Sequence, residues 1–160
     1  MEINKSLIQV SEFHKTFNVP VLDKPQIPSK ERCELRLNLL KEELKELEDA
    51  IKDNNLVEIA DAFCDIQYVL SGSILEFGLK DKFDYLSDEV HRSNMSKACD
   101  SIQEAIATLS HYKQKDGTEG YYKEVNGKYI VYRTGDNKVL KSIKYSPANL
   151  IDIINDDRKG

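Results

Sequence analysis

Apolar residues recur every three or four positions in four segments, a spacing that places them on one face of an α-helix. The segments predict helices over residues 3–17, 29–52, 56–77 and 80–109. The apolar stripes are Ile3, Leu7, Val10 and Phe13; Leu40, Leu44, Leu47 and Ile51; Ile59, Phe63, Ile66, Leu70 and Ile74; and Phe83, Leu86, Val90, Ile102, Ile106 and Leu109. We therefore expect a mainly helical bundle.

Capping residues mark the ends of the second and third helices. Ser29 is a good N-cap before the second helix, and Gly78 is a C-cap signal after the third. The turn-forming run Asp53-Asn54-Asn55 separates these two helices. Because so short a connection reverses the chain, the two helices should be antiparallel neighbours.

The pattern changes to that of β-structure after Gly117. Residues 121–125 and 128–133 flank an Asn126-Gly127 turn and predict a β-hairpin, followed by a further short strand over 138–141. Pro147 opens a last helix that reaches Ile154. The predicted fold class is thus all-α with a small C-terminal hairpin arm, divided into a helical core over 1–115 and an arm over 116–160.

Composition limits the class of protein. The chain has 160 residues, of which 40% are hydrophobic and 32% charged, and its net charge is −5. This acidity argues against nucleic acid as a partner, and no run of 18 apolar residues could cross a membrane. No signal peptide is evident, and Cys33, Cys64 and Cys99 have no CxxC spacing. We therefore expect a cytoplasmic protein with reduced thiols.

Six carboxylates should face one small volume between the second and third helices. Three occupy an arc of about 100° on the second helix, and three occupy about 60° on the third. They are Glu42, Glu43 and Glu46, followed by Glu58, Asp61 and Asp65. Like charges this close need a counter-charge, and a set of oxygen ligands favours Mg²⁺ or Mn²⁺.

An alternative interpretation of the stretch from Glu42 to Asp49 is a solvated helix face with Lys41 and Lys45 as partners. The third helix fits this alternative less well, because it is apolar on most sides and buried carboxylates need partners. Arg32 and Arg36 precede the acids and either pair with carboxylates or bind a phosphate. Asn94 and Lys97 interrupt the fourth apolar stripe and indicate either a polar pocket or a turn into solvent.

With these motifs placed, the chain resembles the all-α nucleoside triphosphate pyrophosphohydrolases, the superfamily of MazG, phosphoribosyl-ATP pyrophosphohydrolase and the dimeric dUTPases. The resemblance lies in EELKE at 42–46 and EIAD at 58–61, which match the metal signature of that superfamily. Three further stretches resemble the phosphoribosyl-ATP pyrophosphohydrolase-like branch. They are EFHKTFNVP at 12–20, EVHRSNMSK at 89–97 and KVLKSIKYSPANL at 138–150.

The resemblance implies a Mg²⁺-dependent hydrolase that cuts the α–β phosphoanhydride of a nucleotide and releases pyrophosphate and a monophosphate. It implies that Glu42, Glu43, Glu46, Glu58 and Asp61 hold the metal. A bound Mg²⁺ would lower the pKa of a coordinated water, and Glu42 or Glu43 would act as the catalytic base that takes its proton. It also implies substrate contacts from Asn94 and Lys97. We assign Lys141 to substrate binding as well, and we assign Asp65 to supporting the metal ligands or positioning the substrate. Members of the superfamily dimerise, so a homodimer or a pair of dimers is expected.

Two other classes compete with this interpretation. A di-iron carboxylate bundle requires Glu-x-x-His pairs, but Asp49 and Asp61 stand where those histidines would be. A non-catalytic helical module that binds a nucleotide or a protein would keep the acids without turnover.

Overall fold

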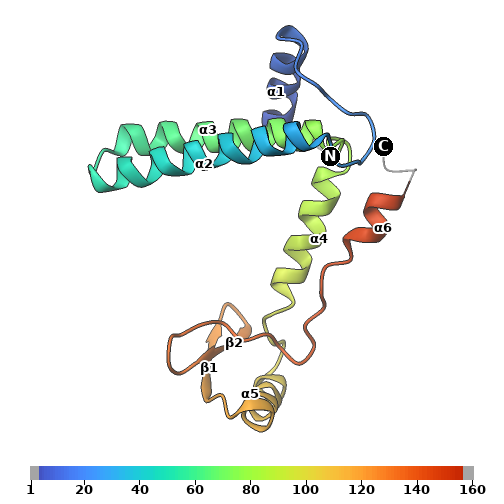
Figure 1. Cartoon of the computed structure of the whole chain (residues 1–160). Coiled ribbons are helices and arrows are strands. Elements are labelled where there is room, and N and C mark those ends of the chain that lie inside the picture. The colour runs from blue at the N-terminus through green and yellow to red at the C-terminus, as the bar shows by residue number, and fades with distance from the viewer. Residues whose placement is uncertain (1–3, 157–160) are drawn as a thin grey trace. The chain divides into compact units, whose positions relative to one another are not determined.

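The computed structural model describes residues 4–156, which fold mainly as helices with one antiparallel hairpin (Figure 1). This confirms the predicted all-α class with a small C-terminal hairpin. The elements are α1 (Lys5–Thr16), α2 (Lys30–Lys52), α3 (Leu56–Glu76), α4 (Phe83–Met95), α5 (Ile102–Asp116), β1 (Gly120–Val125), β2 (Lys128–Arg133) and α6 (Leu150–Asn155). Ile3, where the first helix was expected to begin, lies outside the described residues.

The chain forms two compact units. Within the described residues, the first contains 4–84 together with 154–156, and the second contains Tyr85–Ile153. The second unit groups α5 with the hairpin, because α5 packs on both strands. The division into a helical core over 1–115 and an arm over 116–160 of the same domain stays a prediction.

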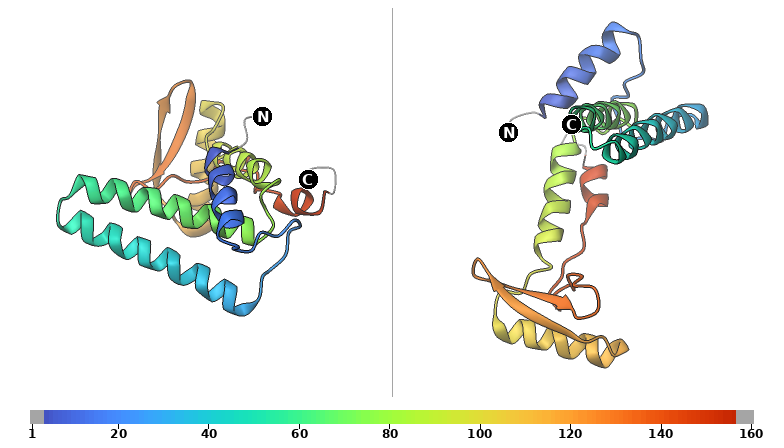
Figure 2. Two further views of the ribbon diagram at one scale, coloured as in Figure 1. Left: turned by 90° about the horizontal axis from the view of Figure 1, so that it is seen from above. Right: turned by 90° about the vertical axis from the view of Figure 1, so that its left-hand side faces the viewer.

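Helices α2 and α3 form the long antiparallel pair of the first unit (Figures 1 and 2). The side chain of Ser29 accepts a hydrogen bond from the backbone of Arg32 at 3.4 Å and caps α2, as predicted. Asn54 takes a positive φ of 51° in the connecting turn. The side chain of Asn55 then caps α3 by accepting hydrogen bonds from the backbone of Val57 and Glu58. Turn chemistry therefore brings the two acidic segments together.

Helix α1 packs on α3 through buried Leu7 and Val10. The chain then returns in extended form alongside the end of α3, where Leu22 N–H donates to the carbonyl of Leu75 at 3.1 Å. Gly78 ends this region with a φ of 66°, and a Cβ there would meet the Lys24 carbonyl at 1.9 Å. Glycine is required at this position by both conformation and space.

In the second unit, α5 covers a hairpin whose strands pair from Gly120 with Arg133 to Val125 with Lys128. The predicted Asn126-Gly127 turn is confirmed, and both residues have positive φ. A small core lies between the helix and the strands. It contains Cys99, Ala105, Val131 and Leu140, with Leu109, Tyr112 and Tyr129 packed against them.

The single helix predicted over 80–109 is wrong, because the chain leaves the helix after Met95 and begins α5 at Ile102. Cys99 pairs with Tyr129 through two backbone hydrogen bonds of 2.9 Å, which draws this segment onto the hairpin. Ser101 then caps α5 by accepting a hydrogen bond from Glu104 N–H at 3.2 Å. The sequence carries this signal as Ser-x-x-Glu, a capping-box pattern.

Two other boundaries also differ from the predictions. The strand expected over 138–141 is reduced to a single bridge between Tyr132 and Val139. The last helix begins at Leu150 rather than at Pro147, because the intervening residues make hydrogen bonds to α4 instead.

Candidate functional site

Of the six predicted carboxylates, Glu42, Glu43 and Glu46 lie on α2, and Glu58, Asp61 and Asp65 lie on α3. Together these six residues are called the acidic segment. Glu43 and Asp65 are half-buried, and the other acids are exposed. Partial burial raises the pKa of Glu43, and the charges of Asp65, Glu46, Glu42 and Asp61 raise it further, in that order. Two carboxylates of α3 therefore lie within electrostatic range of Glu43 on α2.

Glu58, the sixth predicted acid, is exposed in the first turn of α3, one helical turn before Asp61. Within residues 4–156, none of the six carboxylates makes an ion pair or a side-chain hydrogen bond. The neighbouring acids on α2 behave differently. Glu48 accepts from Lys52 at 2.5 Å and Asp49 accepts from Lys45 at 2.5 Å. The solvated-face interpretation thus describes Glu48 and Asp49, whereas the predicted metal ligands lack a counter-charge in the part of the chain that the structure describes.

The carboxylate oxygens do not converge on one point. Among the described residues, no three His, Cys, Asp or Glu side chains are close enough together to hold a metal ion as they stand. Mutual repulsion between like charges opposes such convergence. The chemistry of the set still fits a hard cation, because it offers carboxylate oxygens without competing thiols or imidazoles.

A cavity of about 370 Å³ adjoins the acidic segment. Its wall includes Leu39, one turn before Glu43 on α2, and Tyr68, one turn after Asp65 on α3. Apolar side chains from α1, α2 and α3 line most of it, including Val10, Phe13, Leu35 and Val69. The polar side chains in the wall include His14, Asn18, Arg32 and Arg36. This cavity has no signal in the sequence, because its wall combines three helices with the segment that follows α1.

The two arginines are held by Glu76, which is 1% exposed. Arg32 Nε donates to this carboxylate at 2.9 Å and Arg36 Nε at 2.8 Å. Burial acts to raise the pKa of Glu76, but the two arginines hold it below its ordinary value. Of the two predicted roles for these arginines, the structure shows pairing with an acid.

His14 completes the network and is 2% exposed. Its Nδ1 lies 2.9 Å from the carbonyl of Pro20 and its Nε2 lies 3.2 Å from Arg36 Nη2. Because a guanidinium can only donate, Nε2 must accept and Nδ1 must carry the proton. Burial lowers the pKa of His14, the hydrogen bond to Pro20 opposes this, and Arg36 lowers it further. The ring is therefore a neutral hydrogen-bonding group in the cavity wall.

The remaining predicted substrate residues lie in the second unit. Asn94 is exposed in the last turn of α4, and its side-chain oxygen accepts from Lys97 Nζ at 2.7 Å. Lys141 is exposed in the segment after β2, and its Nζ lies 4.3 Å from the ring centroid of Tyr145. The structure therefore brings Asn94 and Lys97 into contact.

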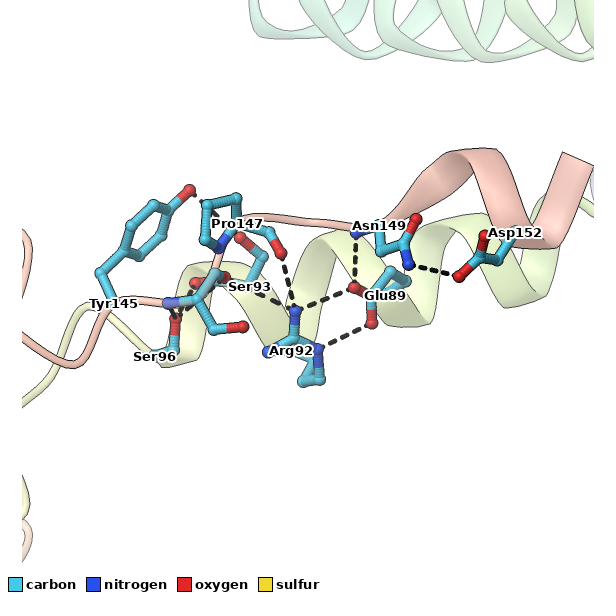
Figure 3. Close-up of polar contacts among 9 residues, drawn as sticks. Glu89, Arg92, Ser93, Ser96, Tyr145, Pro147, Asn149 and Asp152 are labelled. Carbon is cyan, nitrogen blue, oxygen red and sulfur yellow. Dashed lines mark hydrogen bonds and ion pairs between the residues drawn. The ribbon is translucent and has the colours of Figure 1, made fainter.

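Two motif stretches that are far apart in sequence are neighbours in this unit (Figure 3). Glu89 of α4 accepts from Arg92 Nε at 2.7 Å and from the backbone of Asn149 at 2.8 Å. These donors lower the pKa of Glu89 to about 2, with the Arg92 hydrogen bond contributing most. Arg92 also donates to the Pro147 carbonyl at 3.1 Å. The EVHRSNMSK helix thus holds the end of the KVLKSIKYSPANL segment.

Residues 10–94, or 85 of the 160, match the phosphoribosyl-ATP pyrophosphohydrolase family. The chain belongs to the phosphoribosyl-ATP pyrophosphohydrolase family. The matched part contains all six carboxylates and Asn94, whereas Lys97, Lys141 and the α5–hairpin region lie beyond it. Membership in this family supports a nucleotide pyrophosphohydrolase-like hydrolase.

One relative is a viral protein. Uncharacterized protein L479 of Acanthamoeba polyphaga mimivirus is 27% identical over 235 residues, covering 91% of this chain and 94% of the viral protein. Because that alignment is longer than this 160-residue chain, the viral protein carries insertions. In the part of the chain described by the structure, no helix is both long and apolar enough to span a membrane.

Proposed function

We propose that this protein is a Mg²⁺-dependent nucleotide pyrophosphohydrolase, with Mn²⁺ as a substitute metal. It would cut the α–β phosphoanhydride of a nucleoside triphosphate, or of a phosphoribosyl-ATP-like nucleotide, to give a monophosphate and pyrophosphate. The observation that carries this proposal is the set of carboxylates on α2 and α3 that have no counter-charge in the described chain. Family membership supplies the reaction class.

The metal ligands in this proposal are Glu42, Glu43, Glu46, Glu58 and Asp61. A bound divalent cation would neutralise phosphate charge and lower the pKa of a coordinated water. Among the two candidate bases, Glu43 is favoured over Glu42 because its pKa is raised, which makes it a stronger proton acceptor. Among the neighbouring charges, Asp65 raises the pKa of Glu43 most, and Asp65 would position Glu43 or the substrate.

The cavity beside the acids would hold the base and sugar of the nucleotide. A volume of about 370 Å³ lies within the usual range for small-molecule sites. Phe13 and Tyr68 provide aromatic surface, and the fixed His14 and Arg32 provide polar groups for orientation. Asn94, Lys97 and Lys141 would contact the substrate as the family resemblance implies.

A second copy of the chain is the proposed partner. Large apolar side chains are exposed along α2 and α3, which is costly for helices in water. They include Leu37, Leu44, Ile51, Phe63 and Leu70, each between 39% and 58% exposed. We propose a homodimer or a pair of dimers that covers this surface. A light-scattering mass of one chain, 18.4 kDa, would contradict it.

Pyrophosphate release from a panel of nucleotides, with Mg²⁺, with Mn²⁺ and with neither, tests the activity. At least one nucleotide should be hydrolysed with metal, and Glu58→Gln should reduce kcat by at least about a hundredfold, a loss typical for removal of a group that stabilises the transition state. Glu48→Gln is the matched control, because Glu48 lies on α2 and forms an ion pair with Lys52 of the same helix.

Two outcomes would contradict the proposal. One is the absence of pyrophosphate release from every nucleotide with either metal; nucleotide binding under those conditions would favour the non-catalytic helical module. The other is equal activity of Glu58→Gln and Glu48→Gln, since the metal would then not depend on the unpaired carboxylates.

A further inference from the structure

The hydroxyl group of Tyr145 lies beside Ser93 of α4 (Figure 3). The buried hydroxyl of Ser93 donates to the phenolic oxygen of Tyr145 at 3.2 Å. The phenolic proton of Tyr145 therefore remains available, and it meets no acceptor in residues 4–156. The hydrogen bond from Ser93 lowers the pKa of Tyr145, burial opposes this, and Lys141, Lys97 and Arg92 lower it further.

Lys97 and Lys141 have no carboxylate partner in the described part of the chain. Lys97 uses one of its protons on Asn94, and Lys141 lies over the Tyr145 ring. By contrast, the neighbouring Arg92 is neutralised by Glu89. Two ammonium groups and one phenol thus offer several free donors and two uncompensated positive charges to an anion.

Hydrogen bonds within the second unit hold the backbone that carries these groups. Ser142 N–H donates to the Lys97 carbonyl at 3.1 Å, and Tyr145 N–H donates to the Ser142 carbonyl at 2.9 Å. The Ser142 hydroxyl donates to the carboxylate of Glu104, which is 5% exposed and lies on α5. Because these links order the segment before any ligand arrives, less conformational entropy is lost on binding.

We propose that Tyr145, Lys97 and Lys141 form a pyrophosphate-binding surface in which Tyr145 is a further substrate-binding residue. The two lysines would neutralise charge, and the phenol would donate a hydrogen bond to a phosphate oxygen. Two positive charges with several donors fit the doubly phosphorylated end of a nucleotide better than a single phosphate. This inference rests on the proposed function for its substrate, but its chemistry can be measured without turnover.

Isothermal titration of the full-length protein with inorganic pyrophosphate, in buffer without divalent metal, tests the surface directly. We expect wild-type protein to bind, with affinity that falls as salt concentration rises. Tyr145→Phe and Lys141→Met should each weaken binding about tenfold, as expected for loss of a hydrogen bond to a charged group.

Tyr121 and Lys123 provide matched controls in the same unit. Lys123 Nζ also lies over a tyrosine ring, 5.5 Å from the centroid of Tyr121. The hydroxyl of Tyr121 already donates to Asn137 at 2.8 Å. Tyr121→Phe and Lys123→Met should therefore leave pyrophosphate affinity within about twofold of wild type, and circular dichroism should show every variant folded.

The proposal is overturned if wild-type protein does not bind pyrophosphate, or if Tyr145→Phe binds as tightly as Tyr121→Phe. A failure of the proposed function can be distinguished from a failure of this binding surface. Loss of binding in the Tyr145 and Lys141 variants, with no nucleotide hydrolysed by wild type, would support the surface and contradict the enzyme activity. Hydrolysis by Tyr145→Phe with unchanged KM and unchanged pyrophosphate affinity would support the activity and contradict the surface.

Discussion

Replacing Glu43 by Gln should have opposite effects on stability without and with metal. Partial burial raises the pKa of Glu43 most, and the surrounding charges of Asp65, Glu46, Glu42 and Asp61 raise it further. In the absence of a cation, Gln at this position removes a repelled charge from the centre of the group. The variant should therefore be more stable than wild type when no metal is present, and less responsive to metal when it is added.

The size of the first effect follows from the four neighbouring charges. An exposed like-charge pair destabilises by about 0.2–0.5 kcal/mol. Four such pairs amount to about 1 kcal/mol at low salt, and solvent and counter-ions reduce this, because most of these side chains are exposed. At roughly 2–4 °C per kcal/mol, the midpoint of thermal unfolding should rise by about 1–4 °C.

The second effect is larger and has the opposite sign. A metal at a hundred times its Kd stabilises the native state by about 2.7 kcal/mol. This corresponds to a rise of roughly 5–10 °C in wild-type Tm. Glu43→Gln should lose most of that rise, since it removes a ligand. Glu48→Gln should keep the full metal response and should show no rise without metal, because Glu48 is stabilised by Lys45 and Lys52.

Thermal unfolding followed by circular dichroism, with chelator and then across a Mn²⁺ titration, measures both effects. The reasoning about the acidic segment is refuted if Glu43→Gln lowers Tm in chelator and still shows the wild-type metal response. An identical metal response in Glu43→Gln and Glu48→Gln would be equally damaging, because only the unpaired carboxylate is expected to bind.

The pH dependence provides an independent check on the same group. Glu43 has a higher pKa in the folded state than in the unfolded state, so the folded state binds its proton more tightly. Its destabilising contribution is therefore absent below the unfolded pKa and develops fully as pH rises through the folded pKa. The stability difference between Glu43→Gln and wild type in chelator should appear above the ordinary glutamate pKa and vanish below it.

Two further substitutions test the network behind the cavity. Glu76→Gln should destabilise the first unit by about 3 kcal/mol or somewhat less, because Arg36 would keep a buried, unpaired charge while Arg32 is partly solvated. Urea unfolding at pH 7 measures this change, and a loss of stability below about 1 kcal/mol would contradict the prediction. The difference should shrink as pH falls through the lowered pKa of Glu76, where the wild-type carboxylate becomes protonated. Gly72→Ala should reduce the free energy of unfolding by about 1–3 kcal/mol, because the new Cβ would lie 2.8 Å from Arg36 Nη1. In the control Gly135→Ala, the new Cβ meets no atom within 4 Å, so the free energy of unfolding should change by about 0.5 kcal/mol at most.

The first three helices were predictable because their signals are local. Ser29, the Asp53-Asn54-Asn55 turn and Gly78 determine helix ends through hydrogen bonds and φ angles within a few residues. The Asn126-Gly127 hairpin was predictable for the same reason. The break before α5 was not, because Cys99 leaves the helix to pair with Tyr129, a partner thirty positions along the chain.

The sequence alone predicted that the acids of the second and third helices lie on neighbouring antiparallel helices, because a short turn joins those helices and the rise per residue is fixed. It also supplied the resemblance that family membership later confirmed. Tertiary packing decided which acids lack partners, since only folding brings Glu76 to two arginines and leaves Glu43 among like charges. It likewise assembled the cavity wall and the surroundings of Tyr145, because their side chains come from segments whose separation in sequence carries no local signal.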